Sequence, residues 1–290
     1  INYMPELPEV EVVKKSLKKI VCLRIKSIKI NSVKLRYKLD KTSFLGLINK
    51  KILSVKRVSK FILINFSNKK TLIIHLGMTG KFYIISKIGG NPKPLSFYYG
   101  INKNNNHDHI IIILEKKLKL IYNDVRRFGF FKVVWTKDIK KNKHFSKLGP
   151  EPLSEKFNFN YFKEKIFNKK KKIKDLLMDQ RFVSGLGNIY VNEILFLSKI
   201  KPFKISNKIK DKNIISIVRN TKKILKKSIK LGGSSIKDFT YNLGTRGNFQ
   251  QKFKVYGRNG LKCLSINCTE HIKKRIFSNR SSYYCDYCQK

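Results

Sequence analysis

Two adjacent residues near the start of the sequence, Pro5 and Glu6, could together carry covalent chemistry on an aldehyde-like sugar carbon. If translation begins at Met4 and that methionine is removed, Pro5 becomes a terminal secondary amine. Such an amine forms an iminium directly, and a helix N-terminus near lysines should lower its pKa. Glu6 beside it could act as the acid or the base. We therefore predict a nucleophile and its proton-transfer partner here.

This prediction depends on the residues that precede Pro5. The sequence has Ile1, Asn2 and Tyr3 before Met4. If these residues are retained, the Pro5 nitrogen is an ordinary amide and cannot attack, so we expect them to lie upstream of the true start. Glu9 and Glu11 follow closely in a chain with only 18 acidic residues. Their simplest interpretation is that they complement the dipole of a helix that begins here.

Cysteine is concentrated at the other end of the chain. Four of the five cysteines form a C-x4-C pair and a C-x2-C pair, separated by sixteen residues. Paired cysteines in a cytosolic chain bind metal more often than they form disulfides, and four thiolates suit a closed tetrahedral Zn(II) site. The alternative is two unrelated pairs. The predicted ligands of one structural Zn(II) ion are Cys263, Cys268, Cys285 and Cys288. We expect His271 to be a bystander and the lone Cys22 to be packed.

Two short segments combine arginine, aromatic and methionine side chains. Residues 124–129 place two arginines before Phe128, and residues 75–80 present Met78 on a glycine-flanked turn. An apolar wedge beside arginine can fill the gap that an extruded base leaves in DNA. Taken singly, Met78 and Phe128 are more typical of a protein core.

A third segment, residues 183–188, places two glycines between two predicted helices. This geometry can direct backbone N–H groups and a helix N-terminus at a phosphate, with Asn188 as the N-cap. A plain helix connection is the alternative.

The composition favours a polyanionic partner. The chain has 65 Lys+Arg against 18 Asp+Glu, a formal net charge of +47, and no alanine. The missing alanine indicates an A+T-biased coding sequence, so part of the charge reflects mutational drift. A field of this sign still attracts nucleic acid or anionic membrane and excludes an acidic binding surface. The apolar runs are far shorter than the roughly 20 residues of a membrane span, and no signal peptide is evident. We expect a soluble, cytoplasmic protein without a membrane partner.

The elements that must position these residues fall into a β-rich part and a helical part. The predicted elements of the first part are a helix over 8–21, hairpins of 61–66 with 71–76 and of 109–114 with 119–122, and a strand over 130–135. The predicted helices of the second part cover 173–179, 189–198 and 214–229, the last ended by Gly232 and Gly233. Residues 240–253 indicate a mobile loop. Residues 255–260 indicate a strand and turn before the first cysteine pair, and residues 281–284 a strand before the second.

Together and in this order, these pieces resemble formamidopyrimidine-DNA glycosylase, the bacterial 8-oxoguanine glycosylase and abasic-site lyase. The motifs are PELPEVE, HLGMTG, VRRFG, LGPEPL, LMDQ, GLGNIY, KDF, VYGR and YCDYCQK, from Pro5 to Lys290. The resemblance implies an α+β multidomain fold with DNA in the cleft between its domains. The implied parts are an N-terminal catalytic β-sandwich with flanking helices over 4–137, a linker over 138–155, a helix–two-turns–helix domain over 156–252 with a lesion-capping loop over 240–253, and a β-hairpin zinc finger over 253–290.

The resemblance also assigns roles by position. The implied catalytic residues are Pro5 as Schiff-base nucleophile, Glu6 as proton donor, Lys60 assisting β-elimination, and Arg280 on a phosphate and assisting δ-elimination. The implied wedge is Met78, Arg126 and Phe128, with Arg126 facing the orphaned cytosine. The implied phosphate ligands are His107, Lys169, Lys174 and Asn188, and Glu9 is implied near the damaged-base pocket.

The resemblance implies a monomeric base-excision repair enzyme that acts on double-stranded DNA. It would remove 8-oxoguanine and formamidopyrimidines and then nick the strand by β,δ-elimination. Besides residues 1–3, two positions depart from the family: the first cysteine pair has four intervening residues instead of the usual two, and Val125 replaces a proline. Two alternatives stay open. One is a non-catalytic DNA-binding remnant, if residues 1–4 are retained. The other is a glycosylase that prefers oxidised pyrimidines.

Overall fold

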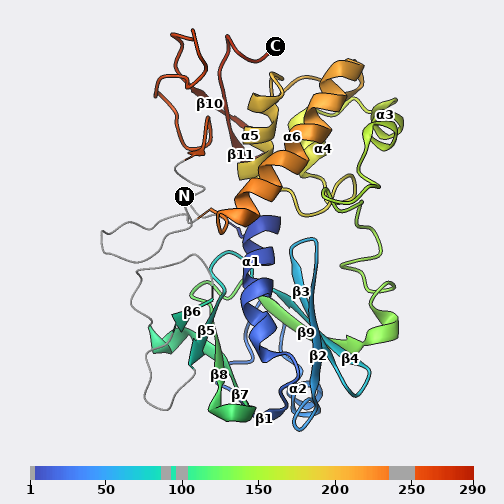
Figure 1. Ribbon diagram of the computed structural model, residues 1–290, viewed down its shortest axis with the longest axis vertical. Helices are drawn as coiled ribbons and strands as arrows, with labels where there is room; N and C mark the ends of the chain where they lie inside the picture. The colour runs from blue at the N-terminus through green and yellow to red at the C-terminus, as the bar shows by residue number, and fades with distance from the viewer. Residues whose placement is uncertain (1–3, 86–92, 96–103, 235–251) are drawn as a thin grey trace. The chain divides into compact units, whose positions relative to one another are not determined.

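The structure is a computed structural model that describes residues 4–85, 93–95, 104–234 and 252–290. Contacts within the chain divide it into two compact units (Figure 1). The first unit comprises Ile1–Ser146 and Gly232–Gly247, and the second comprises Lys147–Leu231 and Asn248–Lys290. Within the described ranges, no helix is long and apolar enough to cross a membrane.

The first unit contains two antiparallel sheets. The five-stranded sheet has the order β1 (Ile25–Ile30), β7 (Asp108–Leu114), β8 (Lys119–Asn123), β5 (Lys81–Ile85) and β6 (Lys93–Pro94). The four-stranded sheet has the order β2 (Ile52–Val58), β3 (Phe61–Phe66), β4 (Lys70–His75) and β9 (Phe130–Trp135). One apolar core includes Ile64 from the second sheet, Ile112 from the first, and Val13 of helix α1 (Leu7–Leu17). Because a single core joins both sheets, this unit is a β-sandwich with a helix packed into it.

The predicted hairpins of the first unit are confirmed. Phe61 pairs with His75 and Asn65 with Thr71, which is the register expected for a short turn between the two strands. The predicted helix over 8–21 is shorter than expected. The α-helix ends at Leu17, followed by a 3-10 turn, and the backbone N–H of Cys22 donates to Ile52 O at 2.9 Å. The pairing with Ile52 turns the chain at Cys22, which is exposed with φ 70°, so the expectation that Cys22 is packed was wrong.

The second unit is helical and ends in a hairpin. Its elements are α3 (Phe159–Ile166), α4 (Ile173–Met178), α5 (Asn188–Leu197), α6 (Asp211–Lys230), β10 (Lys273–Phe277) and β11 (Arg280–Tyr284). Helix α5 is apolar around most of its circumference, with residues 189–196 all buried, so it occupies the centre of the unit. It contacts α4, α6 and β11. Helix α6 is amphipathic and buries one stripe, which includes Ile214, Ile217 and Leu225.

Of the strand and turn predicted over residues 255–260, the turn is confirmed and the strand is wrong. Residues 254–257 form bends and turns instead, because the buried carboxylate of Glu193 accepts the backbone N–H groups of Lys254, Val255 and Tyr256 at 2.8 to 2.9 Å. Those N–H groups are therefore not available to a strand ladder. The strand predicted over 281–284 is confirmed within β11. Of the loop predicted over 240–253, residues 240–251 lie outside the described residues.

Candidate functional site

The first turn of α1 holds Pro5 and Glu6 in a fixed, buried position. Glu6 is the N-cap and is 3% exposed, and its backbone N–H donates to Glu9 Oε2 at 3.0 Å. Pro8 stands within the first turn, where the lack of an N–H has no cost. The PELPE motif thus specifies a helix start with a capping box. The two residues predicted to carry the chemistry sit directly before and at that start.

Glu9 has a second partner far along the chain. Its Oε1 accepts hydrogen bonds from the backbone N–H and the hydroxyl of Ser234, both at 2.8 Å. Ser234 follows Gly232 and Gly233, whose φ angles of 87° and 83° end α6 in the left-handed region that glycine adopts readily. Glu9 therefore fastens the chain that follows α6 to the first turn of α1. The predicted role of Glu9, complementing the helix dipole, therefore does not account for its hydrogen bonds to Ser234.

Glu11 braces the turn that carries Lys60. Its carboxylate accepts Arg57 Nε at 2.8 Å and Lys14 Nζ at 3.0 Å, and Arg57 Nη1 donates to Ser59 O at 2.8 Å. Burial raises the pKa of Glu11, but the hydrogen bonds from Lys14 and Arg57 outweigh it and the pKa is lowered. The brace joins α1 to the β2–β3 turn, so Lys60 is held relative to the helix that Glu6 caps. Sequence reasoning missed Arg57, because its partner lies 46 residues away.

Asp124 joins the two turns predicted to form the wedge. Its fully buried carboxylate accepts the Thr79 hydroxyl, the Tyr122 hydroxyl at 3.1 Å and the Gly129 N–H at 2.8 Å. The Arg126 backbone N–H also donates to Thr79 Oγ1 at 3.0 Å. One carboxylate thus fixes residues 77–80 against residues 125–129.

The same two turns touch backbone to backbone through glycine. Gly77 has φ +66°, and a Cβ placed there would lie 2.4 Å from the Gly129 nitrogen. A Cβ on Gly129 would lie 1.8 Å from the Tyr122 hydroxyl oxygen. Both positions therefore require glycine, which explains the first glycine of HLGMTG and the glycine of VRRFG.

The predicted wedge residues are brought together on these turns. The Arg126 guanidinium lies over the Phe128 ring at 4.6 Å, and Phe128 is 41% exposed. Arg126 Nη1 is buried and has no hydrogen-bond partner among the described residues. Met78 is partly exposed on the neighbouring turn. The two joined turns thus carry an aromatic face, a sulfur-containing side chain and a buried donor without a partner among the described residues.

Two histidines flank the wedge and Lys60. His107, a predicted phosphate ligand, is partly exposed, and its carbonyl accepts the Asp124 N–H at 3.0 Å. His75 was missed by sequence reasoning, although it begins the HLGMTG motif. Burial, then the charges of Lys60 and Arg36, lower the pKa of His75 to about 3. Its Nδ1 accepts the Gly77 N–H at 3.1 Å, so the neutral ring carries its proton on Nε2 and can donate it.

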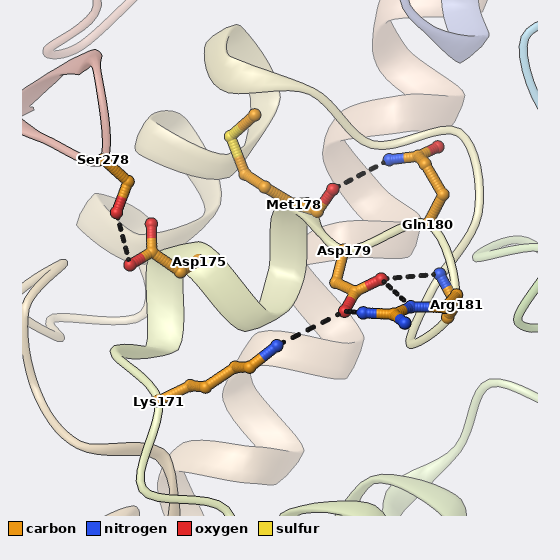
Figure 2. A network of polar contacts seen from close by, with 7 residues as sticks. All are labelled: Lys171, Asp175, Met178, Asp179, Gln180, Arg181 and Ser278. Atoms are coloured by element: carbon orange, nitrogen blue, oxygen red, sulfur yellow. Dashed lines mark hydrogen bonds and ion pairs between the residues drawn. The ribbon is translucent and has the colours of Figure 1, made fainter.

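In the second unit, Asp179 fixes the end of α4 (Figure 2). Its carboxylate accepts the backbone N–H of Arg181 at 3.0 Å and both Nε and Nη2 of the same guanidinium, at 3.0 and 2.9 Å. Lys171 Nζ lies 3.6 Å away. The Arg181 hydrogen bonds lower the pKa of Asp179 to about 2. The carboxylate at the end of this helix is therefore paired with two cationic side chains.

Gln180 holds the glycine-containing turn that leads into α5. Its side-chain amide donates to Met178 O at 3.0 Å and to Leu186 O at 2.9 Å, and its Oε1 accepts the Gly185 N–H at 2.8 Å. The LMDQ and GLGNIY motifs are thus one structural piece. Asn188 is the first residue of α5 and not its N-cap, which is Gly187; that part of the prediction was wrong.

Two of the other predicted phosphate ligands, Lys174 and Asn188, contact the hairpin beside Arg280. Arg280 is exposed, and Ser278 and Ser281 stand on either side of it. Ser278 Oγ donates to Asp175 Oδ2 at 3.0 Å, a contact drawn in Figure 2. Lys174 and Asn188 both donate to Ser281 O, from Nζ at 2.8 Å and Nδ2 at 3.1 Å. Helices α4 and α5 therefore clamp the backbone on both sides of Arg280.

Lys174 and Lys169 differ in their access to solvent. Lys174 is 3% exposed, and its Nζ also donates to Ser282 Oγ at 2.7 Å. Lys169 is exposed and lies in a run of lysines before α4. A hollow of about 450 Å³ is lined by Lys170, Lys171 and Lys172 of that run together with Arg280. The structure therefore places the hairpin tip beside a strongly cationic segment.

The four terminal cysteines form one cluster, as predicted. Their Sγ atoms all lie within 4.8 Å of one another, with Cys263 and Cys288 3.8 Å apart and Cys268 and Cys285 3.7 Å apart. A tetrahedral ZnS4 centre with bonds of about 2.3 Å has sulfur–sulfur edges of about 3.8 Å. The cluster therefore fits a tetrahedral metal ion, and the four-residue spacing of the first pair does not prevent it. His271 is exposed and is not part of the cluster.

Two family models match most of this chain. Residues 4–131 match the family model described as Formamidopyrimidine-DNA glycosylase N-terminal domain, and residues 148–240 match the Formamidopyrimidine-DNA glycosylase H2TH domain. A protein named Formamidopyrimidine-DNA glycosylase from Rickettsia bellii (strain OSU 85-389) is 41% identical over 99% of this chain and 100% of its own length. One from Rickettsia africae (strain ESF-5) is 40% identical over 99% of each chain.

Solved structures are similar over the same length. Lactococcus lactis Fpg in a complex with DNA containing N7-benzyl-Fapy-dG has a TM-score of 0.84 and 35% identity, covering 99% of this chain and 100% of that one. The same protein bound to DNA containing an AP site has a TM-score of 0.82 and 32% identity, with coverage of 98% and 99%. Its complex with DNA containing an oxidised pyrimidine has a TM-score of 0.83 and 34% identity, with coverage of 99% and 100%.

Proposed function

The chain belongs to the formamidopyrimidine-DNA glycosylase family, and on that premise we propose that it excises 8-oxoguanine and formamidopyrimidines from duplex DNA. Family membership makes it a DNA glycosylase of base-excision repair with abasic-site lyase activity. The net charge of +47 suits this substrate, because phosphate neutralisation dominates DNA affinity.

The observation that carries the proposal is the unused donor of the wedge. Arg126 Nη1 is buried without a partner among the described residues, while its guanidinium lies over the Phe128 ring. A buried unpaired donor costs about 1–3 kcal/mol, so a ligand that supplies an acceptor recovers that energy. Extruding a base leaves its partner base with unpaired acceptors and leaves a gap in the stack. We assign Arg126 to the orphaned cytosine and Met78 with Phe128 to the gap.

We assign the chemistry to the start of α1. In a chain that begins at Pro5, the Pro5 nitrogen attacks C1′ of the damaged nucleotide, the glycosidic bond breaks, and the base leaves with a proton. Glu6, buried at the helix start, is positioned to transfer protons at this step. Breaking of the C1′–O4′ bond, with a proton supplied to O4′, then opens the sugar ring and gives the iminium. Loss of a C2′ proton from the iminium expels the 3′ phosphate, and a second elimination expels the 5′ phosphate. We assign Lys60 to the first elimination and Arg280 to the second.

We assign the phosphate contacts to both units. In the first unit they are His107 and the Nε2 proton of neutral His75. In the second unit they are Lys169, Asn188 and Arg280. Because the Lys174 Nζ is buried and bound to Ser281 and Ser282, we propose that it acts by holding the strand beside Arg280.

The cysteine cluster is proposed to hold one Zn(II) ion with a structural role. The metal would join residues 263–268 to residues 285–288 and so stabilise the hairpin that carries Arg280. Burial raises the pKa of the Cys285 thiol to about 12 without metal, so binding must displace a proton and is favoured as pH rises.

Borohydride trapping on a duplex with one 8-oxoguanine opposite cytosine tests the proposal. We expect a covalent adduct that maps to Pro5, and none with Pro5→Gly. An adduct at a different residue would overturn the assignment. If DNA is retarded on a gel but nothing is trapped, the chain is the non-catalytic DNA-binding alternative. The mass of the N-terminal peptide then shows whether residues 1–4 are retained.

A second candidate substrate class is favoured by one comparison. Lactococcus lactis Fpg has been solved with DNA containing an oxidised pyrimidine. Competition between duplexes that carry 8-oxoguanine and thymine glycol separates the two possibilities. Faster cleavage of thymine glycol would reverse our choice of substrate while leaving the nucleophile unchanged.

A further inference from the structure

A hollow in the first unit is not accounted for by the proposed excision reaction. It has a volume of about 310 Å³ and is lined by three separate segments, within residues 37–44, 131–133 and 143–144. This volume lies at the lower end of the range for small-molecule sites. None of its lining residues has a role assigned above.

The walls of the hollow are aromatic. Phe44 and Phe131 are buried, with ring centroids 6.0 Å apart. Tyr37 and His144 stand closer to solvent, with centroids also 6.0 Å apart, and Tyr37 is 42% exposed. Tyr37 also packs edge-on against Phe130 at 5.1 Å, which holds its ring in place. The hollow thus presents fixed ring surfaces on which a flat molecule can stack.

The rim of the hollow is cationic. Lys38, Lys132 and Lys143 line it, and within the described ranges no carboxylate lies at ion-pair distance from their ammonium groups. Lys143 Nζ lies over the Tyr37 ring at 5.6 Å. Among the described residues the acid on the rim is Asp40, which is engaged as the N-cap of α2 (Lys41–Leu45) and accepts the Ser43 N–H at 3.2 Å.

A second, more open hollow of about 510 Å³ adjoins the first. The two share Lys38 and Asp40, and the second adds Lys41. The second hollow therefore extends the lysine-bearing rim of the first and adds apolar lining from Val33 and Leu39. Aromatic walls with lysines at the rim match a molecule that combines a flat ring with a negative charge.

The pKa of His144 depends on the charges that line this hollow. Burial lowers its pKa, and the charges of Lys143, Lys132 and Arg36 lower it further. Its ring is therefore neutral near pH 7 and suited to stacking. An anion bound at the rim would offset those lysines and raise the pKa of His144.

We propose that this hollow binds a nucleotide unit, with the base on Tyr37 and His144 and the phosphate at Lys38, Lys132 and Lys143. Aromatic stacking and a cationic track are the general means by which proteins hold unpaired bases. The same chemistry is offered by a free nucleotide and by an unpaired nucleotide in a DNA strand. The proposal does not depend on the proposed excision reaction.

Nuclear magnetic resonance of the histidine rings in the full chain tests the site with dAMP as the probe. We expect dAMP to shift the His144 ring signals and raise the pKa of His144. Tyr37→Leu should weaken dAMP binding by about fivefold or more, since stacking contributes about 1–3 kcal/mol per base. Tyr37→Phe keeps the ring and should bind as the parent does. No change at His144 up to about 10 mM dAMP, a concentration at which even millimolar affinity saturates the site, overturns the proposal.

A charge variant provides the second test. Lys38→Gln, Lys132→Gln and Lys143→Gln together should weaken dAMP binding about tenfold and reduce its salt dependence. The matched control is Lys26→Gln, Lys29→Gln and Lys56→Gln, which removes three exposed lysines from the same unit. Equal weakening by both triple variants would show only general attraction and would reject a built site.

Duplexes with and without an unpaired tail separate the two sources. One possible result is that a tailed duplex binds more tightly than a blunt one in the parent but not in Tyr37→Leu. That result identifies the occupant as an unpaired nucleotide of the DNA strand. Binding of dAMP without any gain from the tail identifies a free nucleotide. Excision of 8-oxoguanine from a blunt duplex is measured alongside. If only the nucleotide site is wrong, 8-oxoguanine is still excised but dAMP does not bind. If only the proposed function is wrong, dAMP binds but 8-oxoguanine is not excised.

Discussion

The carboxylate of Glu9 accepts both the backbone N–H and the hydroxyl of Ser234 on one oxygen, each at 2.8 Å. Its other oxygen accepts the Glu6 N–H at 3.0 Å. A single buried side chain therefore joins the residue proposed for proton transfer to the chain that follows α6. The two ends of this connection are 225 residues apart in sequence.

Glu9→Gln should impair excision more than it impairs folding. The glutamine amide has the same shape as the glutamate carboxylate. Its NH2 group, however, must face either the Glu6 N–H or the Ser234 donors, and the buried polar group left unpaired costs about 1–3 kcal/mol. We expect excision of 8-oxoguanine in single turnovers to slow about tenfold. Ser234→Ala, which removes the hydroxyl and keeps the backbone N–H, should have the smaller effect. A Gln variant as fast as the parent contradicts this role.

Asp179 should contribute stability that disappears in acid. Hydrogen bonds from Arg181 lower its pKa to about 2 in the folded chain, against about 3.9 when unfolded. The folded state thus favours the ionised form, so the stabilisation is complete above about pH 4 and is lost as the pH falls toward 2. After allowance for solvent screening it amounts to about 1 kcal/mol.

Urea unfolding of the parent and of Asp179→Asn at several pH values checks this. The difference in free energy of unfolding should narrow as pH falls below about 4. Asp211→Asn is the control, because Asp211 and its partner Lys163 are both more than half exposed and such pairs contribute little. A difference for Asp179→Asn that is constant with pH would show that its ionisation does not affect stability.

Lys174→Met and Lys169→Met should separate positioning from direct contact with DNA. Removing the buried Nζ of Lys174 loses two hydrogen bonds to β11, each worth about 1.5–3 kcal/mol when the donor is charged. We expect faster hydrogen exchange in β11 and weaker DNA binding. Lys169 is exposed, so Lys169→Met should weaken binding without a change in β11 exchange. Unchanged exchange in the Lys174 variant would falsify the positioning role.

Zinc removal should abolish DNA binding and spare the first unit. We expect elemental analysis to find one zinc per chain in the parent and none after Cys285→Ser with Cys288→Ser. Without the metal, the hairpin that presents Arg280 loses the bonds that close it. Thermal unfolding followed by the single Trp135 in β9 should keep the transition of the sandwich. Normal DNA binding by the double variant would show that the hairpin is not needed.

Local sequence patterns predicted an element correctly where residues close together in the sequence determine its structure. The β3–β4 hairpin has two short apolar runs on either side of a polar turn, and the cysteine spacing specifies a four-sulfur cluster. The helix start at Leu7 follows from proline and glutamate within one turn. In each case the residues that determine the structure are neighbours in the sequence.

Contacts between distant residues could not be predicted in the same way. Glu193 was expected within a helix, but its carboxylate also determines residues 254–256, which lie 61 to 63 positions away. Because these three backbone N–H groups donate to Glu193, they cannot pair in the predicted strand. Lys174 was implied as a phosphate ligand, and no local pattern indicates that its charge is buried against Ser281. The resemblance to the family identified the site residues. The roles of the carboxylates of Glu9, Glu11 and Asp124 in holding them could be recognised only in the structure.

Asp124 has a consequence for how this protein can change. Because its carboxylate binds Thr79, Tyr122 and Gly129 at once, the turns that carry Met78 and Arg126 behave as a single mechanical part. A substitution that suits one turn is accepted only if the other still fits against it. We expect the two turns to be inherited as a matched pair, so a graft that exchanges only one of them between relatives should fail where a graft of both succeeds.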